Sequence, residues 1–293
     1  MNRDEKRYNN NRVELNRTHK QGDSNQSHDL LALDGVDWDV FSKKGKPVVL
    51  DLRCGAGKST VERFGKYLDK VKAIIGIDCS ESKIAFAQKT HKDFKEIDFY
   101  CCDLDSPDIE IQLKSILAKH NAKEFGLILG GYVLIHLCDP KKLVCKLFNL
   151  IQNDGYVFFQ EPDEFGKICY PNQDVLKTII DCFDALPWIE DRFFAKKIPQ
   201  LLHSAGFTNI ECLYNTMDNL SKSTSEKRHL YDITFSHRRS DYDCVSEQEM
   251  KENIHIAKRL DEALDLMKDL FTKTNFYYVE TRYIFTARKR IVF

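Results

Sequence analysis

The residues best suited to chemistry in this chain stand at the ends of two apolar segments. Residues 48–52 are apolar apart from Asp51 and lead directly into the glycine-containing turn 53–57. A second apolar segment ends in the carboxylate of Asp78. In a parallel α/β sheet, a glycine turn at one strand tip and an acid at the next build a pocket for a nucleotide or nucleoside. The sequence therefore predicts such a pocket, although its glycines alone do not select the ligand.

Two common phosphate-binding patterns are incomplete in this turn. A Walker A loop needs a glycine five positions before Gly57, and Leu52 stands there, inside the predicted strand. A dinucleotide-binding turn needs its third glycine where this chain has Thr60. We therefore expect neither a nucleoside triphosphatase nor a dinucleotide-dependent dehydrogenase.

Further short motifs follow this turn along the chain. Together with residues 50–57 they resemble the motifs of class I S-adenosylmethionine-dependent methyltransferases that act on small molecules. The resemblance covers roughly residues 45–214 and, more loosely, the last predicted strand. The motifs are Ile77-Asp78, Cys102-Asp103-Leu104, Tyr132-Val133-Leu134-Ile135-His136-Leu137-Cys138-Asp139-Pro140, Gly155-Tyr156-Val157-Phe158-Phe159-Gln160-Glu161-Pro162, Asp191-Arg192-Phe193 and Leu201-Leu202-His203-Ser204-Ala205-Gly206-Phe207.

The resemblance implies that S-adenosylmethionine binds at the strand tips. Asp51 would fix the loop and reach the methionine ammonium group. Asp78 would accept both ribose hydroxyls, and Asp103 would accept from the adenine amino group while Leu104 lies against the ring. Glycines in the loop let the backbone approach the cofactor without a Cβ clash. The implied cofactor-binding residues are Asp51, Arg53, Cys54, Gly55, Gly57, Asp78, Cys79, Asp103, Leu104, Gly130 and Gly131, and no metal is expected.

Two positions depart from the family pattern. Arg53 stands where the family has its first glycine, and Gly126 stands where the fourth strand usually carries an aspartate. A guanidinium at position 53 can form a bidentate ion pair with the cofactor carboxylate. It can also crowd the cofactor and weaken its binding, and the sequence leaves both possibilities open.

The candidate catalytic residues are Tyr132, His136 and Glu161, which stand at or just beyond predicted strand tips. Methyl transfer from a sulfonium is an in-line displacement, so it needs alignment and an acceptor atom free of its proton. Glu161 and Asp163 can receive a cationic amine, which favours N-methylation. A packed or capping histidine and solvated loop acids are the alternative interpretations.

These observations predict a methyltransferase that carries out N- or O-methylation of a small-molecule acceptor. The alternatives are a protein methyltransferase and a cofactor-binding module with little turnover. We expect no nucleic-acid partner, because the formal net charge is −1. Residues 130–133, Gly130-Gly131-Tyr132-Val133, also lack the Asn-Pro-Pro-Tyr pattern of base-methylating enzymes.

The elements that position these residues alternate regularly. Apolar segments predict strands and the stretches between them predict helices, which is typical of successive βαβ units. We expect an α/β fold with a Rossmann-like, doubly wound, seven-stranded sheet, mostly parallel with an antiparallel last strand and with helices on both faces. A turn is expected at 153–155. The predicted strands are 48–52, 73–77, 97–101, 125–129, 156–160, 208–214 and 277–287, and the main predicted helices are 60–68, 81–89, 109–119, 140–151, 174–186, 194–204 and 246–271.

The chain divides into four predicted parts. Residues 1–28 are polar and without periodicity, which predicts a flexible tail. Residues 29–214 form the cofactor-binding core, and residues 276–293 supply its last strand. Residues 215–275 form an insertion, irregular to position 244 and then helical, that serves as a lid or as a dimerisation element of a possible homodimer. Its long helix is expected to pack through Ile254, Ala257, Leu260, Leu264, Met267 and Phe271.

Composition sets broad limits on the class of protein. Hydrophobic residues make up 42% and charged residues 30%, as in an ordinary globular chain. No apolar run approaches the roughly 20 residues of a membrane span, and no signal peptide is visible, so we expect no membrane partner. The ten cysteines include no Cys-x-x-Cys pair. They predict buried free thiols in a reducing compartment and hence a cytoplasmic location.

Overall fold

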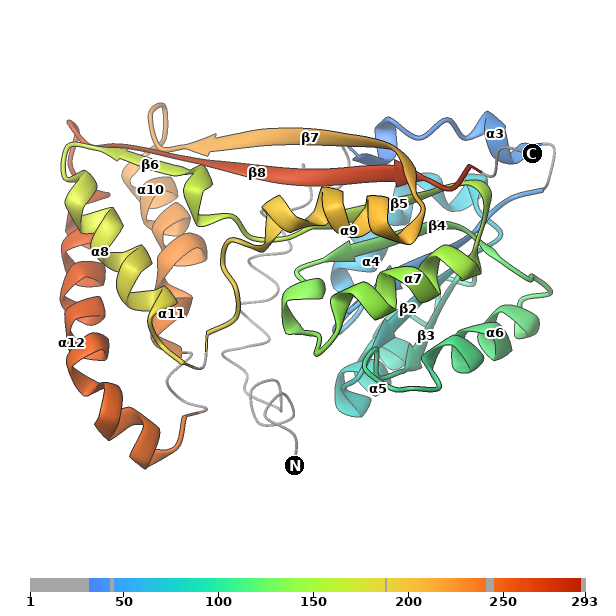
Figure 1. The fold of residues 1–293 in the computed structure, drawn as a ribbon. Helices are drawn as coiled ribbons and strands as arrows, with labels where there is room; N and C mark the ends of the chain where they lie inside the picture. Colours follow the sequence, from blue (N-terminus) through green and yellow to red (C-terminus); the bar gives the residue numbers. More distant parts are fainter. Residues whose placement is uncertain (1–31, 43–44, 188, 241–244, 291–293) are drawn as a thin grey trace. The chain divides into compact units, whose positions relative to one another are not determined.

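A computed structural model of the chain describes residues 32–42, 45–187, 189–240 and 245–290 (Figure 1). These residues group into two compact units. The core unit consists of 32–161, Phe194–Tyr214 and 283–290, and the second unit consists of Pro162–Phe193 and Asn215–Arg282. The tail expected at 1–28 lies outside the described residues.

Five parallel strands form the centre of the core unit in the order β3-β2-β1-β4-β5. β1 and β2 are buried along their whole length because layers cover both faces, which explains their nearly continuous apolar sequences. The order reverses between β1 and β4, so a ligand crevice is expected outside the carboxyl ends of these two strands. The strands are β1 Val48–Leu52, β2 Ala73–Asp78, β3 Ile97–Cys101, β4 Phe125–Gly131 and β5 Ile151–Gln160.

Helices cover both faces of this sheet (Figure 1). Side chains alternate across a strand, so Leu50 and Leu52 enter one apolar layer and Val49 enters the other. This arrangement confirms the doubly wound fold. One layer holds α6 Ile109–Lys119, η2 Leu134–His136, α7 Pro140–Leu150, η4 Phe194–Lys197 and α9 Ile198–Ala205, and the other holds α3 Asp39–Ser42, α4 Lys58–Phe64, η1 Gly65–Lys70 and α5 Glu81–Thr90.

Three predicted helix boundaries are confirmed by their capping contacts. The side chain of Ser80 accepts from the backbone N–H of Lys83 at the start of α5. Asp139 accepts from the N–H of Lys142 at the start of α7. Gly206 ends α9 with a φ of 100°, a left-handed conformation that suits glycine. The helices therefore begin and end where local side-chain chemistry places them.

The second unit surrounds an apolar cluster that includes Leu176, Leu264, Phe271 and Tyr278. β7 Thr208–Asp218 pairs with β8 Tyr277–Arg288. The first residues of β8 pair antiparallel with β6, and its last residues pair antiparallel with β5 of the core unit. The other elements of this unit are η3 Glu164–Gly166, β6 Lys167–Tyr170, α8 Gln173–Asp184, α10 Thr224–Tyr231, η5 Asp232–Ser236, α11 His237–Ser240 and α12 Glu247–Leu270.

The structure differs from the expected elements in three places. The sheet has an eighth strand, β6, and the segment expected to be irregular up to position 244 contains the end of β7 and the helices α10, η5 and α11. Residues 153–155 lie inside β5, where the N–H of Asp154 donates to Lys289 O and the pairing register shifts. A β-bulge therefore uses residues that resemble a turn. Ile254 of α12 is exposed, whereas the other five residues of its predicted face are buried.

The cysteine prediction is confirmed only in part. All nine described cysteines are free. Among the described residues, no helix combines the length and apolar character that a membrane crossing requires. The predicted burial is wrong for four cysteines that are exposed, Cys79, Cys101, Cys138 and Cys212. It is correct for Cys54, Cys102, Cys169 and Cys182.

Candidate functional site

The turn after β1 is fastened to the end of β2. The N–H of Cys54 donates to Ile77 O at 2.9 Å, and the N–H of Gly55 donates to Oδ2 of Asp78 at 3.0 Å. Oδ1 of Asp78 accepts from the N–H of Ser80 at 3.0 Å. A carboxylate has about four accepting positions, so Asp78 retains capacity for two further donors. This arrangement suits a ligand with neighbouring hydroxyl groups.

The two glycines of this turn serve different purposes. Both have positive φ, 57° at Gly55 and 82° at Gly57. A Cβ at Gly55 would meet no atom within 4 Å, whereas one at Gly57 would lie 2.6 Å from Cζ of Phe99 and 2.9 Å from Cδ2 of His91. Gly55 therefore borders open space beside Asp78 that a ligand can enter, and we call this space the cradle. At Gly57, by contrast, glycine is required because the ring of Phe99 in β3 packs against the turn.

The same distinction separates the glycines at the end of β4. A Cβ at Gly131 would meet nothing within 4 Å, but one at Gly130 would lie 2.8 Å from Cγ1 of Val133. Gly131 therefore borders open space at the carboxyl end of β4, next to β1 in the sheet. Gly130 is required by packing inside the core unit.

Asp51 fixes the base of the turn. Its side chain is buried, Oδ1 accepts from Arg63 at 2.6 Å, and Oδ2 accepts from the Thr60 hydroxyl at 2.5 Å. Both partners belong to α4, so the carboxylate joins β1 to the helix that follows the turn. These contacts hold the turn in place, and contact of Asp51 with a ligand stays a prediction.

Arg53 bridges the turn after β1 and the loop after β4. Its guanidinium donates to the main-chain oxygen of Tyr132 at 2.5 Å. Both residues have left-handed backbones, with φ of 56° at Arg53 and 53° at Tyr132. Each such residue other than glycine costs about 1 kcal/mol. One hydrogen bond therefore connects two residues whose backbones are both strained.

Glu161 anchors the loop after β4 from inside the core unit. Its side chain is only 3% exposed, and Oε1 accepts from the N–H groups of Val133 at 2.8 Å and Leu134 at 2.7 Å. Oε2 is buried without a hydrogen-bond partner. Burial raises the pKa of Glu161 to about 7, although those N–H groups and the charge of Arg53 act in the opposite direction. The carboxyl group therefore faces the protein interior rather than an acceptor.

Tyr132 and His136 lie at the carboxyl end of β4, His136 as the last residue of η2, and both are partly exposed. After β3, Asp103 is exposed and accepts from the N–H of Asp105 at 2.9 Å, while Leu104 is buried. Asp105 in turn accepts from the N–H of Cys138 at 3.0 Å. No sequence pattern indicated this link between the loops after β3 and β4.

The two cysteines of the expected cofactor set differ in exposure. Cys54 is buried, and burial, Asp51 and Asp78 all raise the pKa of its thiol well above the usual range. Its thiol therefore stays protonated and packs in the core. Cys79 is exposed, and its carbonyl oxygen accepts from the Cys101 thiol at 3.5 Å. No cluster of potential metal ligands occurs in the described ranges.

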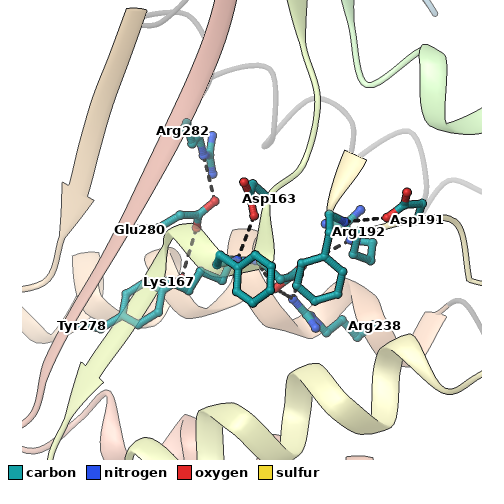
Figure 2. A network of polar contacts seen from close by, with 11 residues as sticks. Asp163, Lys167, Asp191, Arg192, Arg238, Tyr278, Glu280 and Arg282 are labelled. Atoms are coloured by element: carbon teal, nitrogen blue, oxygen red, sulfur yellow. Dashed lines mark hydrogen bonds and ion pairs between the residues drawn. The ribbon is translucent and has the colours of Figure 1, made fainter. Parts of the chain in front are cut away.

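The second unit contains a buried ionic network that no sequence pattern indicated (Figure 2). Glu164 accepts from Arg238 at 2.8 Å, from Lys167 at 2.7 Å and from Arg192 at 3.2 Å. Burial opposes its charge, but these three cations outweigh that cost and hold the pKa of Glu164 well below its usual range. Glu164 and Arg238 are 74 positions apart, so no local pattern could reveal the pair.

Further contacts surround this network (Figure 2). Asp163 accepts from the N–H of Phe165 at 3.0 Å, and the two rings of Phe165 and Phe193 lie 4.6 Å apart. Glu280 accepts from Arg282 at 3.1 Å. Asp163, which the sequence offered as a receiver of a cationic amine, thus caps a turn of the second unit.

A family model described as "Methyltransferase domain" matches residues 43–259. Phosphoethanolamine N-methyltransferase of Triticum aestivum is 30% identical over 122 residues, which cover 41% of this chain and 21% of the relative. Phosphoethanolamine N-methyltransferase 1 of Arabidopsis thaliana is 28% identical over 115 residues, covering 39% and 21%. The matched part thus spans about a fifth of these relatives. The solved structure of the YcgJ protein from Bacillus subtilis has a TM-score of 0.49 at 14% identity, covering 84% of this chain and 93% of that one.

Proposed function

Since this chain belongs to the family of methyltransferase domains, we propose that it transfers a methyl group from S-adenosylmethionine to a small-molecule acceptor. One observation carries the proposal: the open cradle at Gly55 lies beside the Asp78 carboxylate in the turn after β1, one of the two strands between which the order reverses. This is where an α/β sheet places a nucleoside ligand.

The residues around the cradle fit the parts of this cofactor. With the cofactor bound, Asp78 would accept hydrogen bonds from the ribose hydroxyls, Asp103 would accept one from the adenine amino group, and Leu104 would face the ring. Asp51 holds the turn, and the residues beside it, Arg53, Cys54, Cys79, Gly130 and Gly131, complete the surroundings. When bound, the cofactor supplies an electrophilic methyl group whose transfer leaves a neutral thioether. The protein then has to align the acceptor and keep its attacking atom free of a proton.

We propose an amine as the acceptor and N-methylation as the reaction. The matched relatives are named phosphoethanolamine N-methyltransferases, although the match spans only about a fifth of their length. Tyr132 and His136 stand partly exposed at the end of β4, next to the turn after β1. A neutral imidazole at His136 can take the proton of an ammonium group near neutral pH. Glu161 contributes by anchoring their loop.

Calorimetric titration and a transfer assay together test this function. The purified chain is titrated with S-adenosylhomocysteine and then incubated with methyl-labelled cofactor and a panel of acceptors, with phosphoethanolamine first and hydroxyl compounds for comparison. We expect binding and label transfer to amines only. Absence of cofactor binding would refute the proposal, transfer to hydroxyl compounds alone would refute N-methylation, and binding without any transfer would favour a module with little turnover.

Compartment and partners complete the proposal. The free thiols of the described cysteines suit the reducing conditions of the cytoplasm. The formal net charge of −1 offers no basic footprint for a nucleic acid, and we propose no membrane partner. Residues 215–275 are proposed as a lid or a dimerisation element. Light scattering decides between these roles, since a monomer would exclude the dimer.

A further inference from the structure

Arg53 and Tyr132 form an unusual pair. Neither is glycine, both have left-handed backbones, and the Arg53 guanidinium donates to the Tyr132 carbonyl oxygen at 2.5 Å. Residues in this region persist only where their surroundings fix them, and they concentrate at functional sites. A glycine at position 53 would adopt the same φ without strain but could not make the hydrogen bond.

The opposite side of Tyr132 is fixed by the end of β5. The N–H of Tyr132 donates to Gln160 O at 2.7 Å, and the next two N–H groups, of Val133 and Leu134, both donate to Oε1 of Glu161. The N–H groups of three successive residues therefore donate to the last residue of β5 and to the residue after it. The carbonyl oxygen of Tyr132 accepts from the turn after β1. The loop after β4 is fastened on both sides.

We infer that Arg53 is a positioning residue, which acts through the main chain of Tyr132 to hold the acceptor side of the site. This inference rests on the proposed function. It differs from both roles that the sequence left open for Arg53, because the Arg53 guanidinium donates to the main chain of the protein. Arg53 also joins the turn after β1 to the loop after β4, and the sheet order reverses between these two strands.

The test compares Arg53→Gly and Arg53→Lys with the parent chain. Affinity for S-adenosylhomocysteine is measured by calorimetry, and amide hydrogen exchange is measured at Tyr132, Val133 and Leu134. We expect Arg53→Gly to change the affinity by less than about threefold while exchange at these amides accelerates about tenfold or more, the scale of one lost hydrogen bond to a charged donor. Arg53→Lys retains a donor and should restore part of the protection.

Turnover is the second measurement, because a residue that only stabilised the fold would change neither kcat nor the KM for the acceptor. With phosphoethanolamine as acceptor, Arg53→Gly should lower kcat about tenfold or raise KM for the acceptor, with KM for the cofactor unchanged, and Arg53→Lys should recover part of the loss. Lys95→Gly, which removes another cation from an exposed turn, is the matched control and should match the parent.

Three results would overturn the inference. A tenfold fall in S-adenosylhomocysteine affinity for Arg53→Gly would make Arg53 a ligand of the cofactor, a rise would make it a steric obstacle, and unchanged exchange would remove its role in the loop. Exchange does not depend on the acceptor, so it decides the matter even if phosphoethanolamine is not methylated. Failure of the parent chain to bind S-adenosylhomocysteine would instead refute the proposed function.

Discussion

At the scale of single residues, Gly55 and Gly57 stand two positions apart with the same sign of φ but different surroundings. Alanine at either position should cost about 1 kcal/mol of backbone strain. Gly57→Ala should lose more stability, because its Cβ would lie 2.6 Å from Phe99 Cζ. Gly55→Ala should fold nearly normally but bind S-adenosylhomocysteine at least about tenfold more weakly, because its Cβ enters the cradle.

Denaturant unfolding and calorimetry on both variants measure this contrast. Gly131→Ala provides a comparison for an added Cβ without backbone strain, because a Cβ there also meets no atom within 4 Å and φ is not positive. Equal affinities for the parent and Gly55→Ala would show that the open space at Gly55 is not where the cofactor binds.

Glu161 makes stability depend on pH in an unusual direction for a carboxyl group. Its pKa in the folded protein, about 7, lies above its ordinary value of 4.5 because of burial, so folding favours the protonated form. The stability present below pH 4.5 is then lost as the pH rises toward 7, by up to about 3 kcal/mol. Glu161→Gln cannot ionise, so its free energy of unfolding should not show this fall.

Urea unfolding at pH 5, 6, 7 and 8 checks the effect. The difference in stability between Glu161→Gln and the parent should move in favour of the variant across this range. Glu96→Gln, which alters an exposed glutamate, should instead follow the parent at every pH. Parallel profiles for Glu161→Gln and the parent would show that Glu161 does not bind its proton more tightly in the folded protein.

At the scale of elements, Glu164 joins β6, α11 and the segment before η4 through its cations. Glu164→Gln would leave Arg238, Lys167 and Arg192 without their shared counter-charge in a buried place. We expect a loss of about 3–5 kcal/mol in stability. Because the folded-state pKa of Glu164 is depressed, its contribution is complete above pH 4.5 and is lost as the pH falls below that value.

Thermal unfolding of Glu164→Gln at neutral pH measures the loss. Asp181→Asn removes the partner of Lys177 in an exposed i,i+4 pair and serves as the control, with an expected change of about 0.5 kcal/mol or less. A Glu164→Gln protein as stable as the control would mean that the network contributes no net stability.

The same elements show how far the sequence could predict the structure. β1 and β2 were predictable because a strand covered on both faces is apolar throughout. β6 was not, since its buried Lys167 is paired with the distant-acting network of Glu164, and the bulge at Asp154 uses residues that also form turns. Local pattern therefore suffices where burial is uniform, and fails where a distant partner makes a polar residue buried.

The candidate site divides in a similar way. The strand-tip position of Asp78 could be predicted, because it follows an apolar run. The packing role of Gly57 and the inward direction of Glu161 could not, because they depend on Phe99 and on the loop after β4. Arg53 was recognisable as a departure from the family pattern, but only the structure reveals its bond to Tyr132.

At the scale of the whole molecule, the cofactor should stabilise the fold by mass action. At a concentration about 100 times its Kd, S-adenosylhomocysteine should add about 2.7 kcal/mol to the free energy of unfolding. Asp78→Asn should show little of this gain, because one carboxylate oxygen becomes a donor that faces the N–H of Gly55 or Ser80. Denaturant unfolding with and without ligand measures both values.

Asp93→Asn, at an exposed position, is the control and should gain as much from the ligand as the parent chain. An Asp78→Asn variant that gains equally would separate the carboxylate from cofactor binding. Failure of the parent to gain stability would count against the cofactor itself.

β8 has a consequence for how the protein is made. This strand pairs with β6 in the second unit and with β5 in the core unit, yet it follows both in the chain. A ribosome adds residues in order, so the sheet lacks the strand that joins β5 to β6 until position 288 has left the exit tunnel. Until then the edge of β5 is an unpaired template for other chains. Synthesis of this protein should therefore depend on chaperones that shield that edge until β8 has emerged.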